Sequence, residues 1–124
     1  MTAKSWLSQG KNIEKEIKAL KEALCAAENI PEFQRSNYET ALKTKIDELI
    51  LTKSSILSAI YCIEDNILRT LLIERFLNNR TWETVAHRLG YDFYHVIKRL
   101  YPKAVNEVEK SEIFKNQLGG NSKQ

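Results

Sequence analysis

The first half of the chain is dominated by apolar residues that recur at steps of three, four or seven, the spacing of a helical seam. This spacing predicts a long helix from about Lys4 to Glu28, with a stripe formed by Trp6, Ile13, Ile17, Leu20, Leu24 and Ala27. Pro31 ends that helix, because proline disfavours the helical conformation at the residue before it. A second helix is predicted from Phe33 or Tyr38 to Ile63, with a stripe formed by Leu42, Ile46, Leu49, Lys53, Ile56, Ile60 and Ile63.

Two such helices predict an antiparallel hairpin over residues 1–64, either closed on itself or paired with a second copy. Lys53 is the polar member of the second stripe, and a lone polar residue in a seam typically fixes the register or the number of partners at a cost in stability. We therefore expect the hairpin to serve oligomerisation or partner binding. A homodimer through the hairpin seam is the expected form.

The second half carries shorter helical patterns with clear boundary residues. Asp65 or Asn66 is a candidate N-cap for a third helix over residues 67–77, and Asn78-Asn79 ends it because asparagine enters the left-handed region at low cost. Thr81 caps a fourth helix over residues 82–89, which buries Trp82 or Val85 together with Ala86 and Leu89.

Gly90 supplies a left-handed residue that ends the fourth helix, and Asp92 caps the fifth. Pro102 lies inside the fifth helix, where it removes a hydrogen bond and is expected to kink or split the helix near Tyr101. The apolar stripe of this helix is Phe93, Ile97, Leu100, Tyr101, Ala104 and Val108.

The composition fits one ordered helical domain with an extended arm. The chain has 124 residues, of which 43% are hydrophobic and 28% charged, with only four glycines and two prolines. We expect an all-α fold, in which the long N-terminal hairpin precedes a three-helix helix-turn-helix domain over residues 65–112. A frayed tail over residues 113–124 completes the prediction.

Positive charge is concentrated in the second half. Residues 1–64 carry nine basic and nine acidic side chains, whereas residues 65–124 carry ten basic and seven acidic ones. Inside residues 80–103 the basic residues number five and the acidic residues two. Such a placement is what contact with phosphate requires, although an excess of solvated lysines would look similar.

The fourth and fifth helices meet the demands of a DNA-binding helix-turn-helix. A small residue stands where the helices cross, a glycine stands at the turn, and the second helix has a polar outward face. The start of the fourth helix is suited to bind phosphate, and its candidate contacts are Arg80, Thr81 and Trp82. The outward face of the fifth helix is suited to a DNA groove, and its candidate contacts are Tyr94, His95, Lys98, Arg99 and Lys103. From the pattern alone, a generic packed helix pair is equally probable. The alternative function is a helical protein-interaction module without direct DNA readout.

Other classes of function lack their residues. Cys25 and Cys62 are far apart, which favours buried free thiols in a reducing cytoplasm, and no apolar segment suits secretion or a membrane span. His87 and His95 have no clustered carboxylates or thiols, so no metal site is expected. Neither a nucleophile with its base nor a phosphate-binding glycine loop is present. We therefore expect no enzymatic activity and no cofactor.

One stretch carries a family resemblance: "RTLLIERFLNNRTWETVAHRLGY", residues 69–91, with supporting likeness at "MTAKSWLSQ" and "KIDEL". The chain resembles a family of unknown function encoded by phages and prophages of Gram-positive bacteria, whose C-terminal half is similar to region four of sigma factors. That family is also similar to ArpU- and RinA-type late-gene regulators. The resemblance implies a promoter-binding regulator of phage late genes in the cytoplasm of a bacterial host. Double-stranded DNA is the implied partner, with RNA polymerase as a further one.

The chain departs from the family pattern after Gly90. Alignment on Gly90 makes Val96 the next core residue, whereas the later residues match only if Ile97 takes that place. One extra residue therefore lies in this stretch, so that either the turn is longer or the helix is rotated by about 100°. The family also tends to place arginines where this chain has Phe93 and Tyr94.

Overall fold

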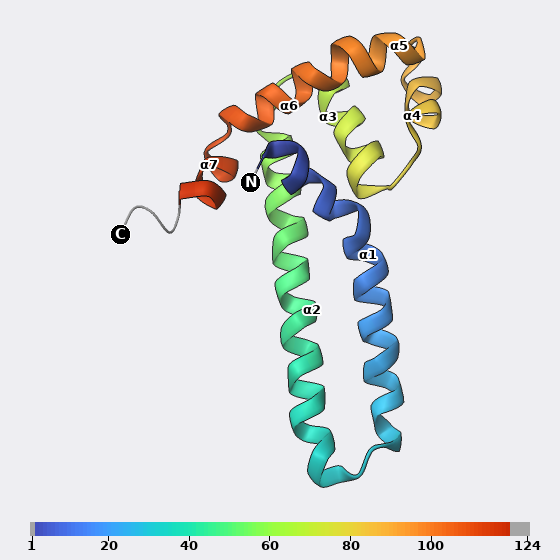
Figure 1. The fold of residues 1–124 in the computed structure, drawn as a ribbon, viewed down its shortest axis with the longest axis vertical. Helices are drawn as coiled ribbons and strands as arrows, with labels where there is room; N and C mark the ends of the chain where they lie inside the picture. Colours follow the sequence, from blue (N-terminus) through green and yellow to red (C-terminus); the bar gives the residue numbers. More distant parts are fainter. Residues whose placement is uncertain (1, 120–124) are drawn as a thin grey trace.

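The computed structural model describes residues 2–119, within which every regular element is a helix (Figure 1). The prediction of an all-α fold is therefore confirmed. The longest elements come first: α1 (Ala3–Ala26) leads through the 3₁₀ turn η1 (Ala27–Asn29) into α2 (Glu32–Tyr61). Pro31 stands directly before α2, as expected of a residue that tolerates only a first helical turn.

Helices α1 and α2 lie antiparallel and bury the predicted seam between them (Figure 1). Ile13 and Ile17 of α1 are buried, as are Leu42 and Ile46 of α2. Lys53 forms an ion pair across the seam with Glu14 of α1. The seam is thus filled within one chain, as in the hairpin closed on itself.

The remaining helices gather at the open end of this hairpin. In chain order they are α3 (Asn66–Leu72), the π-helical η2 (Ile73–Leu77), α4 (Trp82–Leu89), α5 (Phe93–His95), the π-helical η3 (Val96–Leu100), α6 (Tyr101–Lys110) and α7 (Glu112–Gly119). Figure 1 shows α6 crossing over α3, with α4 and α5 at the far end of that pair.

The predicted cap residues bound these helices. Asp65 accepts hydrogen bonds from the Ile67 and Leu68 amides at 2.8 and 3.2 Å. At the other boundary of this segment, Asn79 adopts a left-handed conformation with φ 58°. The Asp65 cap satisfies amides that a helix start leaves without partners, which fixes where α3 begins.

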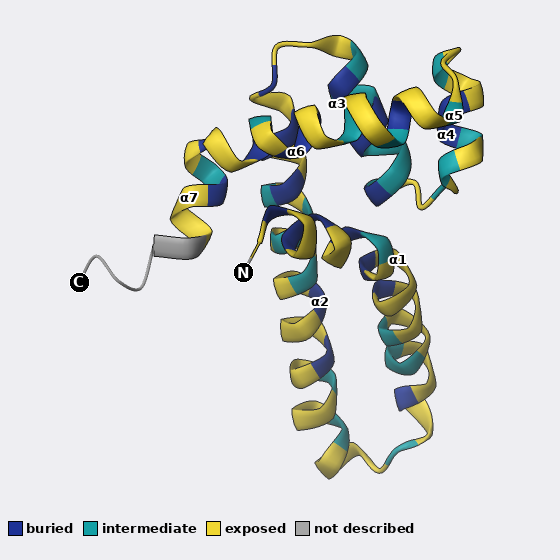
Figure 2. Ribbon diagram, turned by 45° about the horizontal axis from the view of Figure 1, so that its top comes forward, coloured by how far each residue is buried: buried dark blue, intermediate teal, exposed yellow. Residues whose placement is uncertain are grey.

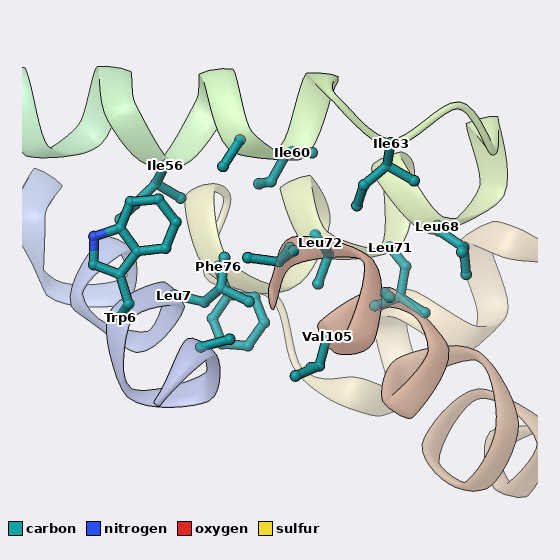
Figure 3. Packing of buried hydrophobic residues seen from close by; sticks show 14 of the residues in the cluster. Trp6, Leu7, Ile56, Ile60, Ile63, Leu68, Leu71, Leu72, Phe76 and Val105 are labelled. Carbon is teal, nitrogen blue, oxygen red and sulfur yellow. The ribbon is translucent and has the colours of Figure 1, made fainter. Parts of the chain in front are cut away.

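The main core lies where the two ends of the hairpin meet the short helices. Trp6 and Leu7 from the start of α1 pack with Ile56 and Ile60 from the end of α2 (Figure 3). This cluster is completed by Leu71, Leu72, Phe76 and, from α6, Val105 (Figure 3). Burial therefore concentrates at this end, while the distal half of the hairpin is mostly exposed (Figure 2). Hairpin and short helices share one continuous core.

Gly10 sits where α1 passes closest to η2. A Cβ atom added at this position would lie 2.9 Å from the backbone oxygen of Phe76 and 3.3 Å from a methyl carbon of Leu77. Glycine costs roughly 0.5–1 kcal/mol relative to alanine inside a helix. The close approach of the two backbones explains why a glycine occupies this helical position.

The helix that contains Pro102 does not split. Leu100 and Tyr101 keep right-handed helical angles, so that α5, η3 and α6 form one continuous helix. The Tyr101 amide donates to the Val96 carbonyl, five residues back, which makes the turn before Pro102 a wide π turn. In a regular α turn the proline ring would meet the carbonyl four residues back. The expected irregularity near Tyr101 is therefore this widened turn.

The last described helix, α7, covers part of the segment predicted as a tail. Phe114 is 3% exposed, and its ring centre lies 5.3 Å from that of Trp6. Ser111 starts the helix by accepting a hydrogen bond from the Phe114 amide at 3.1 Å. Residues 113–119 are thus helical, whereas residues 120–124 of the predicted tail lie outside the described residues.

Candidate nucleic-acid interface

A tight turn joins α4 to the continuous helix α5–η3–α6. Gly90 adopts φ 77°, and its amide donates to the Ala86 carbonyl at 3.0 Å. The Tyr91 amide donates to the same carbonyl at 3.1 Å. Asp92 then accepts hydrogen bonds from the Tyr94 and His95 amides at 3.0 and 3.4 Å and starts the next helix. Three residues, Gly90, Tyr91 and Asp92, therefore separate the end of one helix from the start of the next.

The second helix of this pair turns a cationic face to solvent. Its exposed side chains include five of the predicted contacts: Tyr94, His95, Lys98, Arg99 and Lys103. Between Phe93 and Asn106 the sequence contains no acidic residue. Across residues 2–119, no acidic side chain forms a salt bridge with Lys98, Arg99 or Lys103. The three cations are thus available to an anionic partner, and we call the five residues the cationic face.

Aromatic rings occupy the N-terminal end of the cationic face. The ring of Tyr91 lies 5.2 Å from that of His95, and the ring of Phe93 lies 5.7 Å from that of Tyr94 in an edge-on arrangement. Tyr94 is 68% exposed. The first turn therefore offers ring surfaces and a phenol to a partner, while the cations follow one and two turns later.

The opposite side of the same helix fixes its register. Val96 is fully buried, together with Ala104, Val105 and Val108, whereas Ile97 is only half-buried. The prediction that Ile97 takes the core position is therefore wrong. A π turn holds one residue more than the corresponding α turn, so the widened turn over residues 96–100 shifts the face presented by the residues that follow it.

The start of α4 is arranged differently from the expectation. Thr81 is exposed and caps the helix, accepting a hydrogen bond from the Thr84 amide at 3.2 Å. Arg80 instead donates from Nε to a Glu74 carboxylate oxygen at 2.8 Å, and the Glu74 side chain is only 15% exposed. Arg88 lies 3.8 Å from the other oxygen of that carboxylate. Glu74 thus partly neutralises two cations beside α4.

Trp82 is half-buried and packs against the core. Its ring lies 4.7 Å from that of Tyr101, and the guanidinium carbon of Arg75 lies 4.6 Å from its centre. Burial raises the pKa of the Tyr101 phenol above 10.0, and the nearby Arg75 charge partly opposes that rise. Trp82 therefore couples α4 to α6 and does not lie on the cationic face.

Two residues outside the predicted set share the exposed surface of this helix. Tyr91 is 41% exposed and contacts His95, while Asn106 is exposed and follows Lys103 by one turn. The helical spacing provides the signal for both, since residues three or four apart lie on the same side of a helix. An asparagine amide can donate to phosphate or pair with an adenine edge.

Other kinds of site find little support in the residues described. Residues 2–119 contain no group of three or more His, Cys, Asp or Glu side chains placed to hold a metal ion. Both cysteines are free and exposed, which contradicts the prediction of buried thiols. None of the helices over residues 2–119 combines the length and apolarity that a membrane crossing requires.

Comparison of the chain with family models, with curated proteins and with solved structures found no match.

Proposed function

We propose that the chain is a sequence-specific DNA-binding regulator of transcription. In this proposal α4, the turn at Gly90 and the helix α5–η3–α6 act as a helix-turn-helix, with the last helix in the major groove. The observation that carries the proposal is the cationic face. Its three cations form no salt bridge within residues 2–119, and the sequence has no acidic residue from 93 to 106. The resemblance to region four of sigma factors supports the same function.

Each exposed residue has a defined role in this proposal. Tyr94 and His95 lie in the first turn, the part of a recognition helix that normally meets base edges. Lys98 and Arg99 follow one turn later, where they can reach guanine or phosphate, and Lys103 contacts the backbone. Thr81 caps α4, and its exposed hydroxyl donates to Thr84 Oγ1 at 3.0 Å, a hydrogen bond that a contact with phosphate would have to replace.

The regulator acts at promoters of phage late genes in the bacterial cytoplasm, as the family resemblance implies. Activation fits that resemblance better than repression, with RNA polymerase as a second partner. A homodimer would present two cationic faces to paired half-sites, which strengthens the contact made by one small helix. The competing function is a protein-interaction module in which the cationic face binds no DNA.

Salt dependence and site enrichment test the proposal together. Sheared DNA of the encoding genome is captured on the full chain and sequenced, and the affinity for an enriched fragment is then measured across a salt series. The logarithm of the binding constant falls as log salt rises, and each lost phosphate contact makes this slope shallower by about 0.9. We expect the Lys98→Ala/Arg99→Ala double variant to lower the slope by up to about 1.8.

The matched control is Lys43→Ala/Lys45→Ala, which removes two exposed lysines of α2 far from the cationic face. It should leave both the enriched sites and the slope unchanged. If no fragment is enriched, or if the two double variants bind alike, DNA is not the partner of the cationic face. That result would favour the protein-interaction module.

A further inference from the structure

A second surface, unrelated to the cationic face, lies on the outward side of the C-terminal half of α2. Four apolar side chains there remain open to solvent: Ile50 is 44% exposed, Leu51 67%, Leu57 41% and Tyr61 64%. Figure 2 shows exposed residues along the side of α2 that is turned away from α1. Single exposed apolar residues are ordinary, but a contiguous group of them marks an interaction site.

Charged side chains are missing from this part of α2. Between Leu49 and Ile63 the sequence has one charged residue, Lys53, and its ammonium group is engaged by Glu14 in the seam. The outward positions that are not apolar are the small serines Ser54 and Ser58. A solvated helix face normally carries charges, so their absence over three turns points to a covered surface.

The spacing of these residues is that of a second seam. Ile50, Ser54, Leu57 and Tyr61 follow steps of four, three and four, the pattern that lets one helix pack along another. We propose that a second copy of this chain covers the surface, with its own α2 antiparallel to the first and a two-fold axis between Ser55 and Ile56. We call Ile50, Ser54, Leu57 and Tyr61 the outer seam.

The outer seam is complementary to itself in this arrangement. Leu57 of one copy lies opposite Ser54 of the other, so that a large side chain meets a small one. Ile50 likewise lies opposite Tyr61 of the second copy. A parallel pairing would instead place Asp47, one turn before Ile50, against its own counterpart and leave the serines facing each other. Like charges at facing positions are unfavourable, which selects the antiparallel arrangement.

The end of the outer seam carries charges of both signs. Arg69 donates to the carbonyls of Ile63 and Glu64 at 2.7 and 2.9 Å, which holds its guanidinium at the end of α2. The guanidinium carbon lies 5.6 Å from the centre of the Tyr61 ring. Because Ile50 faces Tyr61 of the second copy, Asp47 comes to the end of the second copy's α2, where both Arg69 and Glu64 lie.

Oligomeric state is the direct test, measured on the full chain by sedimentation equilibrium over a concentration series. The chain is expected to show a monomer–dimer equilibrium. Leu57→Glu places two carboxylates in the outer seam and should weaken dimerisation at least tenfold, while far-UV circular dichroism remains that of the parent. A wild-type chain that stays monomeric at every concentration would overturn the proposal.

The matched control is Phe33→Glu, which changes an 80% exposed apolar residue of the same helix outside the outer seam. It should dimerise like the parent chain. If both variants weaken dimerisation equally, general surface apolarity and not the outer seam is responsible, and the proposal fails.

Cross-linking tests the antiparallel arrangement. In a Cys25→Ser/Cys62→Ser background, a short thiol cross-linker should join copies that carry Ile50→Cys and Tyr61→Cys together. Copies that carry Ile50→Cys alone should remain unlinked, because their thiols lie far apart across the two-fold axis. Equal cross-linking of the single and double variants would contradict the antiparallel register. Neither experiment involves DNA, so the dimer and the DNA-binding proposal stand or fall separately.

Discussion

The guanidinium carbon of Arg75 lies 4.6 Å from the centre of the Trp82 ring, while the same side chain donates to the Arg80 carbonyl at 2.9 Å. Arg75 thus ties the end of η2 both to the connection before α4 and to α4 itself. Trp82 in turn contacts Tyr101 of α6. The position of α4 relative to the cationic face therefore depends on one arginine in the neighbouring helix.

Replacement of this arginine should loosen α4. We expect Arg75→Met to lower the free energy of unfolding by about 2 kcal/mol, because a partly desolvated cation–π contact and a charged hydrogen bond are both lost. Chemical denaturation measures the change. Arg99→Met is the control, since its side chain is exposed, and it should stay within about 0.5 kcal/mol of the parent. Equal effects of the two substitutions would refute the role of Arg75.

A second prediction concerns the approach of α1 to η2 at Gly10. Helix propensity alone predicts that Gly10→Ala stabilises the chain by about 1 kcal/mol. The added Cβ would lie 2.9 Å from the Phe76 oxygen, so we expect a destabilisation of about 1–3 kcal/mol. The sign of the measured change in unfolding free energy decides between the stabilisation that helix propensity predicts and the destabilisation that the close approach predicts. Gln9→Ala, at an exposed neighbouring position, should change stability little, and a stabilised Gly10→Ala variant would mean that the close approach is absent.

Local chemistry explains what the sequence could predict of this fold. The caps at Asp65, Thr81 and Asp92 and the left-handed residue at Gly90 are each settled by a side chain and its near neighbours. The seams followed from spacing, because apolar residues three and four apart must share one face. These features required no knowledge of distant contacts.

Features set by distant contacts escaped prediction. Val96 is fully buried in the core shared with α3 and α6, whereas the spacing had assigned that position to Ile97. Arg80 had the chemistry of a phosphate ligand, but the fold brings Glu74 within 2.8 Å of it. Whether a cation is free or paired is a tertiary property, so the sequence alone overestimates the number of free cations.

The buried phenol predicts a loss of stability at alkaline pH. The folded pKa of Tyr101 is raised above 10.0, so the folded state keeps its proton while the unfolded chain loses it. Its contribution to stability is therefore complete below pH 10.0 and declines as the pH rises above that value. Thermal unfolding of Tyr101→Phe should show a shallower decline between about pH 9 and 11 than the parent does. The exposed Tyr94→Phe is the control and should follow the parent.

The last prediction separates a cation that holds the fold from one that binds DNA. Arg80 is paired with Glu74, whose side chain is 15% exposed, whereas Lys98 is exposed and forms no salt bridge to another described residue. Arg80→Gln should therefore lower the free energy of unfolding, by roughly 1–3 kcal/mol, because the Glu74 carboxylate loses its nearest partner. The salt slope of DNA binding by Arg80→Gln should equal that of the parent. Lys98→Gln should keep the parent's stability and lower the salt slope by about 0.9.

Paired measurements of unfolding and of DNA affinity, made on both variants in the same buffers, give this comparison. The opposite result would be a shallower salt slope with Arg80→Gln and an unchanged slope with Lys98→Gln. It would assign the phosphate contact to the start of α4. In that case the Glu74 ion pair must open on binding, because one guanidinium cannot hold its 2.8 Å contact with Glu74 and turn the same Nε to a phosphate. Glu74→Gln would then strengthen DNA binding, whereas with Lys98 as the contact it should only destabilise the fold.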